Sequence, residues 1–268
     1  MKKLIAIAMT MVMSGILLTG CGGTSKAGPA STGGGTTSAQ KKIVIGLDDN
    51  FPPMGFRDEK NELVGFDIDL AKEAAKRLGM EVEFKPIDWN SKEVELNSKK
   101  IDVLWNGLTI TDERKKNIAF TKAYMDNRQI IVVLPDSKIK TKADLAGKVV
   151  GVQDGSSSVD AVNADAATAK TFKELKKYPD NVNALLDLKA GRINAVVVDE
   201  IVGRYYINKK PGEYVVLSDN FGSEEYGVGL RKDDSELLGK LQKALDDMKK
   251  EGKSTEISKK WFGEDIVK

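Results

Sequence analysis

The sequence predicts an α/β protein with two sheets, and three observations support this fold class. Short apolar runs rich in Val and Ile alternate with stretches of helical periodicity from residue 41 to the end of the chain. The 268 residues are 41% hydrophobic and 31% charged, which is a globular composition and enough for one large or two medium domains. Near-continuous Val/Ile runs between helices are typical of parallel strands that are buried on both faces. We therefore expect these runs to form parallel strands.

The first 40 residues carry targeting signals. Residues 2 and 3 are lysines and residues 4–18 are apolar, too short for a comfortable transmembrane span, so residues 1–20 are predicted to be a signal peptide. This segment ends in Leu18-Thr19-Gly20-Cys21, which resembles the lipobox of bacterial lipoproteins. The resemblance implies that Cys21 receives lipid and anchors an extracytoplasmic protein to the bacterial cell membrane. The alternative is a simple signal peptide with an incidental cysteine.

The segment after the lipobox is rich in Gly, Ser and Thr. Residues 22–40 contain six glycines and seven Ser or Thr residues, and they cannot bury much apolar surface. Residues 21–40 are therefore predicted to be the lipidated cysteine and a flexible linker, and the folded part begins near residue 41.

The first elements of the folded part alternate as expected for α/β proteins. Residues 43–47 are an apolar run followed by acidic residues and two prolines, which predicts a strand ending in a loop. Residues 67–78 place Leu and Ala on one helical face and are followed by Gly79, which predicts an amphipathic helix. Residues 82–84 predict a second strand, and Asn90 with Glu93 predicts a capping box for a second helix.

The same alternation continues to the end of the chain. Strands are predicted at residues 101–105, 130–134, 149–152 and 195–198, and helical stretches follow the last two of these runs. An apolar stripe over residues 237–248 predicts a final helix that Gly252 ends.

Two absences and the charge balance exclude several functions. The chain has no histidine and one cysteine, which excludes histidine-dependent triads, histidine metal sites, cysteine zinc sites and an intrachain disulfide. The sequence therefore implies no cofactor and no metal. Without residues 1–20, which contain two lysines and no acidic residue, the chain has 40 basic and 40 acidic residues. This neutral balance gives no electrostatic footprint for nucleic acid.

Polar side chains follow three of the predicted strands. Arg114 lies in a polar segment after one strand, Ser156 follows another in a Gly-Ser turn, and Asp199 directly follows a third. Ligands of open α/β sheets bind beyond the carboxyl ends of strands. Arg114 and the turn at Ser156 would bind an anion, and Asp199 would bind a cation. Such a pair of sites suits the zwitterion of an α-amino acid. Each residue alone also fits a plain structural role, as a helix cap or a surface ion pair.

Five segments resemble the extracellular solute-binding proteins of polar amino-acid ABC transporters, family 3. They are residues 46–56, 64–71, 101–102, 107–115 and 259–263, in the order that the family has them. The resemblance implies a periplasmic-binding-protein type 2 fold, in which two mixed sheets flanked by helices form two lobes joined by two crossover strands. It places residues 41–126 and 226–268 in one lobe and residues 127–225 in the other.

The resemblance also implies roles for individual residues. Arg114 would bind the ligand α-carboxylate, together with Thr109 and with Ser156 or Ser157 from the facing lobe. Asp199 would bind the α-ammonium group.

Further implied contacts complete the ligand site. Carbonyl oxygens of Asn106 or Gly107 would share the ammonium group, although members that bind basic amino acids usually have Ser or Thr at this position. Phe51 and Trp89 would pack against the ligand, and Asp48 would meet its side chain.

These roles predict a polar amino acid with a mid-sized or long side chain, with cystine or glutamine ahead of arginine and lysine. The implied partners are a permease and an ATPase on other chains, and the protein is expected to be a monomer. A dehydratase-type enzyme on the same fold is the rival class, and recovery of an unchanged ligand separates the two. A purely structural surface lipoprotein would need none of the residues at the strand ends.

Overall fold

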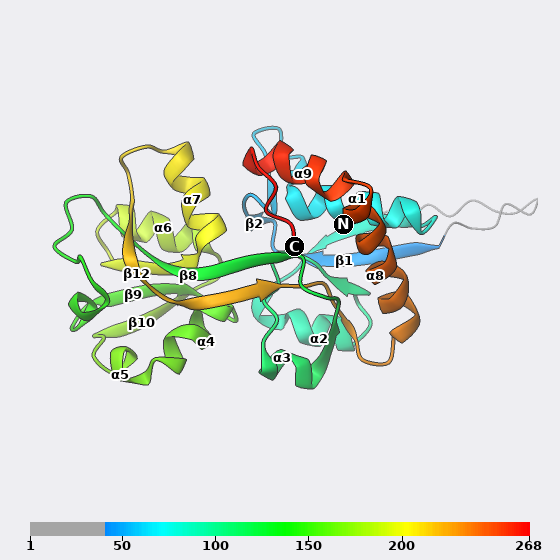
Figure 1. Cartoon of the computed structure of the whole chain (residues 1–268). Helices are drawn as coiled ribbons and strands as arrows, with labels where there is room; N and C mark the ends of the chain where they lie inside the picture. The colour runs from blue at the N-terminus through cyan, green and yellow to red at the C-terminus, as the bar shows by residue number, and fades with distance from the viewer. Residues whose placement is uncertain (1–40) are drawn as a thin grey trace, which may run out of the picture. The chain divides into compact units, whose positions relative to one another are not determined.

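The structure is a computed structural model, and it describes residues 41–268. The predicted signal peptide, Cys21 and the linker lie outside the described residues. The folded part has two lobes, each built on a five-stranded sheet, and we refer to them in chain order as lobe 1 and lobe 2 (Figure 1). None of the helices between residues 41 and 268 has the length and apolar character needed to span a bilayer.

Lobe 1 is a mixed sheet with helices on both faces. In spatial order its strands are β5 (Glu81–Pro86), β1 (Lys42–Leu47), β6 (Val103–Leu104), β13 (Gly229–Arg231) and β7 (Ile118–Phe120). The first three are parallel, and β13 is antiparallel to both of its neighbours. Its helices are α1 (Phe66–Arg77), the 3-10 turn η1 (Trp89–Ser91), α2 (Lys92–Asn97), α3 (Asp112–Asn117), α8 (Ser235–Lys250) and α9 (Lys253–Phe262). A small antiparallel sheet adds β2 (Asn50–Phe51), β3 (Gly55–Arg57) and β4 (Leu63–Val64).

Lobe 2 has the same layered architecture. Its strands in spatial order are β10 (Glu174–Tyr178), β9 (Val149–Gln153), β11 (Ala195–Asp199), β8 (Met125–Val133) and β12 (Val215–Tyr226). Its helices are the 3-10 turn η2 (Lys142–Leu145), α4 (Ser157–Ala164), α5 (Ala166–Ala169), α6 (Asn181–Lys189) and α7 (Glu200–Lys209). The prediction of a parallel strand is wrong for residues 130–134, because β8 is antiparallel to both β11 and β12. A strand buried on both faces shows the same apolar run whatever its direction.

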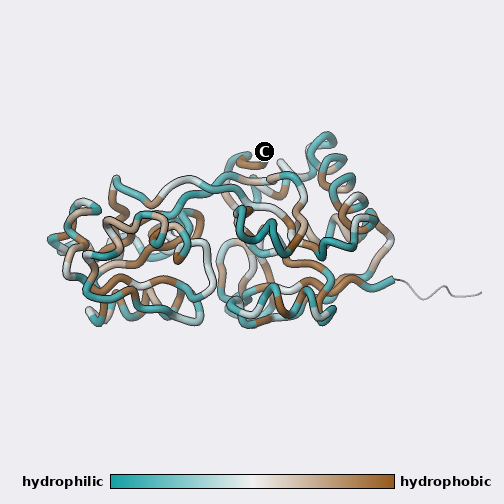
Figure 2. The backbone as a smooth tube through the Cα atoms, turned by 90° about the horizontal axis from the view of Figure 1, so that it is seen from below, coloured by the Kyte–Doolittle hydropathy of each residue, from teal (hydrophilic) through white to brown (hydrophobic). Residues whose placement is uncertain are grey.

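Alternation along the strands divides the core of each lobe into two layers. Ile43 and Ile45 of β1 pack on the side of α1, whereas Val44 between them packs with Leu96 on the side of α2. Figure 2 shows the hydrophobic stretches of the backbone, in brown, running through the interior of both lobes. Helices cover both faces of each sheet. The loops at the strand ends are therefore the part of each lobe where polar side chains can meet a ligand.

Two long strands connect the lobes. β8 and β12 pair from Val133–Val215 to Met125–Tyr226, and Figure 1 shows them running together between the lobes. Their lobe 1 ends are held by isolated bridges, from Tyr226 to Thr109 and from Met125 to Val267. Side chains of these strands therefore lie beside residues of both lobes.

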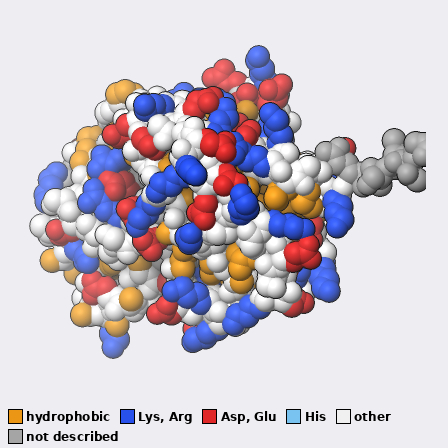
Figure 3. Space-filling view, turned by 45° about the vertical axis from the view of Figure 1, so that its right-hand side comes forward, with side chains coloured by type: hydrophobic (Ala, Val, Ile, Leu, Met, Phe, Trp, Pro, Cys, Tyr) orange, Lys and Arg blue, Asp and Glu red, His pale blue; other side chains and the backbone are white. Residues whose placement is uncertain are grey.

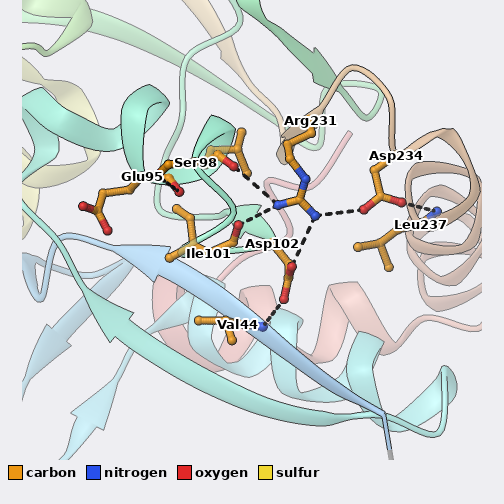
Figure 4. A network of polar contacts seen from close by, with 9 residues as sticks. Val44, Glu95, Ser98, Ile101, Asp102, Arg231, Asp234 and Leu237 are labelled. Carbon is orange, nitrogen blue, oxygen red and sulfur yellow. Dashed lines mark hydrogen bonds and ion pairs between the residues drawn. The ribbon is translucent and has the colours of Figure 1, made fainter.

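Arg231 fastens the C-terminal part of the chain to lobe 1. Its guanidinium donates to the carbonyl oxygen of Ile101 at 2.7 Å and to the carboxylates of Asp102 and Asp234, each at 3.2 Å (Figure 4). Asp102 in turn accepts from the amide of Val44 in β1 at 3.0 Å. Strands from opposite ends of the chain are thus fixed in one sheet, which positions the loops that follow them.

The predicted second helix begins later than expected. The carboxylate of Asp88 accepts from the Asn90 amide and caps a 3-10 turn, and α2 begins only at Lys92. The expected capping box is therefore wrong, and Glu93 accepts from Asn117 instead.

On the face seen in Figure 3, basic and acidic side chains are interspersed, as expected from the balanced charge.

Candidate functional site

Arg114 lies at the junction of the two lobes. It occupies the first turn of α3, where Thr111 caps the helix by accepting from the Arg114 amide at 3.1 Å. The side chain is 5% exposed, and it donates to the carbonyl oxygen of Thr109 at 2.8 Å and to that of Gly155 in lobe 2 at 3.3 Å. Burial lowers the pKa of the guanidinium. A buried guanidinium that bonds to neutral carbonyls still carries a charge that an anionic ligand can balance.

Lys92 is a second buried cation that the sequence did not indicate. Its ammonium group donates to the carbonyl oxygens of Gly155 at 2.7 Å and Trp89 at 3.2 Å, and it lies 5.3 Å from the centre of the Trp89 ring. Burial, followed by repulsion from Arg114, lowers the pKa of Lys92 to about 8. Two cations from lobe 1 thus converge on one carbonyl of lobe 2.

The predicted hydroxyl groups meet across the lobes, with one exception. Thr109 Oγ1 lies 2.9 Å from Ser157 Oγ at the start of α4. Ser156 is buried at the N-cap position of α4, but its hydroxyl donates to the Gln153 carbonyl oxygen at 2.7 Å. Of the two serines, Ser157 is therefore the one whose hydroxyl contacts Thr109.

Asp199 ends β11 and is 3% exposed. Its Oδ1 accepts from Tyr226 Oη at 2.6 Å, Asn127 Nδ2 at 2.7 Å and Gln129 Nε2 at 3.0 Å. Burial raises its pKa well above the usual value, and the charge of Glu224 raises it further. A buried carboxylate with neutral donors alone is a strong acceptor for a cation.

Sequence reasoning missed four residues that surround Asp199. They alternate along the two connecting strands and point to the same place: Asn127 and Gln129 on β8, and Glu224 and Tyr226 on β12. The alternation of these polar residues within the strands was the available signal. It identifies the site only when the pairing of the strands is known.

Asn106 and Gly107 have structural contacts that fix the loop after β6. Asn106 Oδ1 accepts from the Asp48 amide at 3.1 Å, and the Gly107 amide donates to Asp67 Oδ2 at 2.7 Å. Gly107 has a φ of +56°, and an added Cβ would lie 2.8 Å from the Phe51 ring. A side chain at position 107 would therefore disturb both the turn and the packing of Phe51.

Asp48 joins the lobes at a cavity of about 560 Å³. Its Oδ1 accepts from the Asn50 amide at 2.9 Å, and its Oδ2 accepts from Gln153 Nε2 of lobe 2 at 2.6 Å. Burial raises its pKa to about 6. Trp89 also lines the cavity, whereas Phe51 lies against Gly107. The cavity is acidic, since its lining includes five carboxylates and one ammonium group: Asp48, Asp49, Asp88, Asp154, Asp180 and Lys177.

Comparisons with known proteins agree with this arrangement. Residues 43–264 match the model of the bacterial extracellular solute-binding proteins, family 3. The chain is 33% identical to the L-cystine-binding protein TcyJ of Escherichia coli K12 over 84% of both chains. It is 33% identical to the arginine-binding extracellular protein ArtP of Bacillus subtilis over 98% of both chains.

A solved structure of an amino-acid-binding protein is also similar to this chain. The substrate-binding protein of an ABC uptake transporter from Streptococcus pneumoniae, with bound histidine, superimposes with a TM-score of 0.82 at 39% identity. The match covers 84% of this chain and 94% of that one. These relatives are binding proteins for amino acids.

Proposed function

Because the chain belongs to the bacterial extracellular solute-binding proteins of family 3, we propose that it captures a polar amino acid between its lobes and delivers it to an ABC permease. The observation that carries this proposal is the convergence of Arg114 and Thr109 of lobe 1 with Gly155 and Ser157 of lobe 2. Because these four residues come from both lobes, a ligand that contacts all of them can do so only when the two lobes are closed on each other. Asp199 supplies the opposite charge for the ammonium group.

The acidic cavity supports a basic ligand side chain. Five carboxylates and one lysine line it, and Asp48 is held between the lobes. Asp154 pairs with that lysine and Asp49 pairs with Arg57, which leaves three carboxylates of the lining without an ion pair among the described residues. A cationic side chain would also gain about 0.5–2 kcal/mol from the Trp89 ring. We therefore propose arginine and lysine ahead of cystine and glutamine, which reverses the order expected from the sequence, and the acidic lining of the cavity supports this order.

We also propose that the protein performs no chemistry on its ligand. The relatives are binding proteins, and this supports the same role here. Mass spectrometry of the ligand after release from the complex tests this point. An unchanged amino acid is expected, and a dehydrated product would favour the enzyme alternative.

The proposed place of work is the outer face of the bacterial cell membrane. Cys21 follows the lipobox-like residues, and lipid on its thiol would retain the protein near its permease and ATPase, which are other chains. We propose a monomer whose lobes divide between residues 126 and 127 and between residues 225 and 226. The pairing of β8 with β12 at these positions supports this division.

A thermal-shift screen of the purified protein against the twenty amino acids and cystine tests the proposed function. A ligand at 100 times its dissociation constant adds about 2.7 kcal/mol to the free energy of unfolding. Arginine or lysine should stabilise most. If no amino acid changes the melting temperature, the proposal fails.

A further inference from the structure

Glu224 lies beside Asp199, and the two carboxylates share their hydrogen-bond donors. Asn127 Nδ2 donates to Asp199 Oδ1 at 2.7 Å and to Glu224 Oε1 at 2.6 Å. Gln129 Nε2 donates to the same two oxygens, at 3.0 and 2.9 Å. Two carboxylate oxygens are therefore held next to each other by neutral amides.

Glu224 also reaches the hydroxyl groups of the clamp. Its Oε1 accepts from Thr109 Oγ1 at 2.9 Å and from Ser157 Oγ at 3.2 Å. Glu224 thus contacts both the residues proposed for the ligand carboxylate and the partners of Asp199. It lies between the two halves of the proposed zwitterion site.

The side chain of Asn127 offers a third acceptor. Asn127 is 7% exposed, and its Oδ1 has no hydrogen-bond partner among residues 41–268. An ammonium group has three N–H donors, and the carboxylates of Asp199 and Glu224 with the Asn127 oxygen provide three acceptors.

Among residues 41–268, no lysine or arginine forms an ion pair with Asp199 or Glu224. Arg114 of α3 faces the two carboxylates, but its hydrogen bonds go to the carbonyls of Thr109 and Gly155. Tyr226 donates to Asp199, and the charges of Asp160 in α4 and Glu93 in α2 also raise the pKa of Arg114. Neighbouring carboxylates cannot both ionise easily, so such a pair is stable when it holds one proton.

We propose that Glu224 is a second acceptor for the ligand ammonium group, and that the ammonium group replaces a proton which Asp199 holds beside Glu224 before binding. This inference rests on the proposed function. The O–H bond of the protonated Asp199 carboxyl breaks, its proton leaves to the solvent, and the ammonium group then lies between the two carboxylates. The raised pKa of Asp199, to which Glu224 contributes, is consistent with such a proton.

Calorimetry in buffers of different ionisation enthalpy tests the inference, because it counts the protons released on binding. We expect the wild type to release close to one proton when L-arginine binds at pH 7. Glu224→Gln should bind L-arginine at least tenfold more weakly and release almost none. Lys92 and Asp48 are unchanged in this variant, so the difference isolates the carboxylate pair.

Glu225→Gln is the matched control. Glu225 is the next residue of β12, it is exposed, and it pairs with Lys268. This variant removes the same charge and should leave both affinity and proton release unchanged. Wild-type binding without proton release overturns the inference even if Glu224→Gln does not fold, and so does a Glu224→Gln protein that binds as the wild type does. If the wild type binds no amino acid, the proposed function itself fails.

Discussion

Gly155 of lobe 2 packs against Asn90 of lobe 1 so closely that an added Cβ would lie 2.7 Å from Asn90 Cα. Gly155 also has a φ of +68°, and its carbonyl accepts from both Lys92 and Arg114. A side chain at this position would therefore separate the lobes where the two buried cations meet.

We expect Gly155→Ala to weaken amino-acid binding by tenfold or more, because the lobes cannot close to their native distance. Gly191→Ala is the control, since Gly191 has a φ of +70° and an added Cβ would contact nothing within 4 Å. Both changes cost roughly 1–2 kcal/mol of stability, because alanine must adopt the left-handed backbone conformation at these positions. Calorimetry separates them, and equal affinities would show that the Gly155 contact does not control closure.

The site residues that the sequence predicted can be located from their neighbours in the chain, whereas those that it missed depend on contacts between distant segments. Asp199 ends a strand, and Arg114 and Ser157 lie in the polar segments that follow two other strands, so their location was predictable from the sequence. Asn127 and Glu224 are far apart in sequence and meet only because β8 pairs with β12. The sequence places Lys92 at the start of a short helix without indicating burial, and its contacts with Trp89 and with Gly155 of lobe 2 appear only in the structure.

The fold was predictable to a similar extent. Alternating apolar runs and helices predicted an α/β protein with two sheets, because burial on both faces of a sheet requires that pattern, and the family resemblance implied the two lobes. Strand direction was not available from the same pattern, as β8 demonstrates. The short strands β2, β3 and β4 also have too few residues to show any period.

Asp48 predicts a pH dependence for basic ligands. Its pKa of about 6 means that the carboxylate is present above pH 6 and is lost as the pH falls through 6. Affinity for L-arginine should therefore fall between pH 7 and pH 5, and affinity for L-glutamine should change less. Asp48→Asn should cost about 1–3 kcal/mol of L-arginine binding at pH 7 and flatten this dependence. Unchanged L-arginine binding by this variant would remove Asp48 from the side-chain site.

Asp67 predicts a pH dependence of stability. It is fully buried and accepts from the Gly107 amide and from Tyr124 Oη, and burial raises its pKa to about 7. The folded state thus binds this proton more tightly than the unfolded state, so stability falls as the pH rises from about 4 to 7. Asp67→Asn should remove a few kcal/mol of this decrease, at about 1.4 kcal/mol per pKa unit. Urea unfolding at pH 5 and pH 8 measures the free energy of unfolding of both proteins. If this free energy falls by the same amount between the two pH values in the wild type and in Asp67→Asn, the assignment is contradicted.

Cys21→Ser should abolish membrane anchoring, because only the thiol can take the lipid. The wild type is expected to incorporate labelled fatty acid and to sediment with membranes. A Cys21→Ser protein that still incorporates the label would exclude Cys21 as the anchor.

The most direct test of the amino-acid clamp is calorimetric titration of Arg114→Ala with the amino acid that stabilises the wild type most. Loss of the guanidinium should cost roughly 2–5 kcal/mol of binding, because it leaves the ligand carboxylate buried without its partner. Arg114→Lys should recover only part of this, since an ammonium group lacks the planar pair of donors. Arg204→Ala, which removes an exposed arginine paired with Glu200, should bind as the wild type does. A folded Arg114→Ala protein with wild-type affinity would contradict the account.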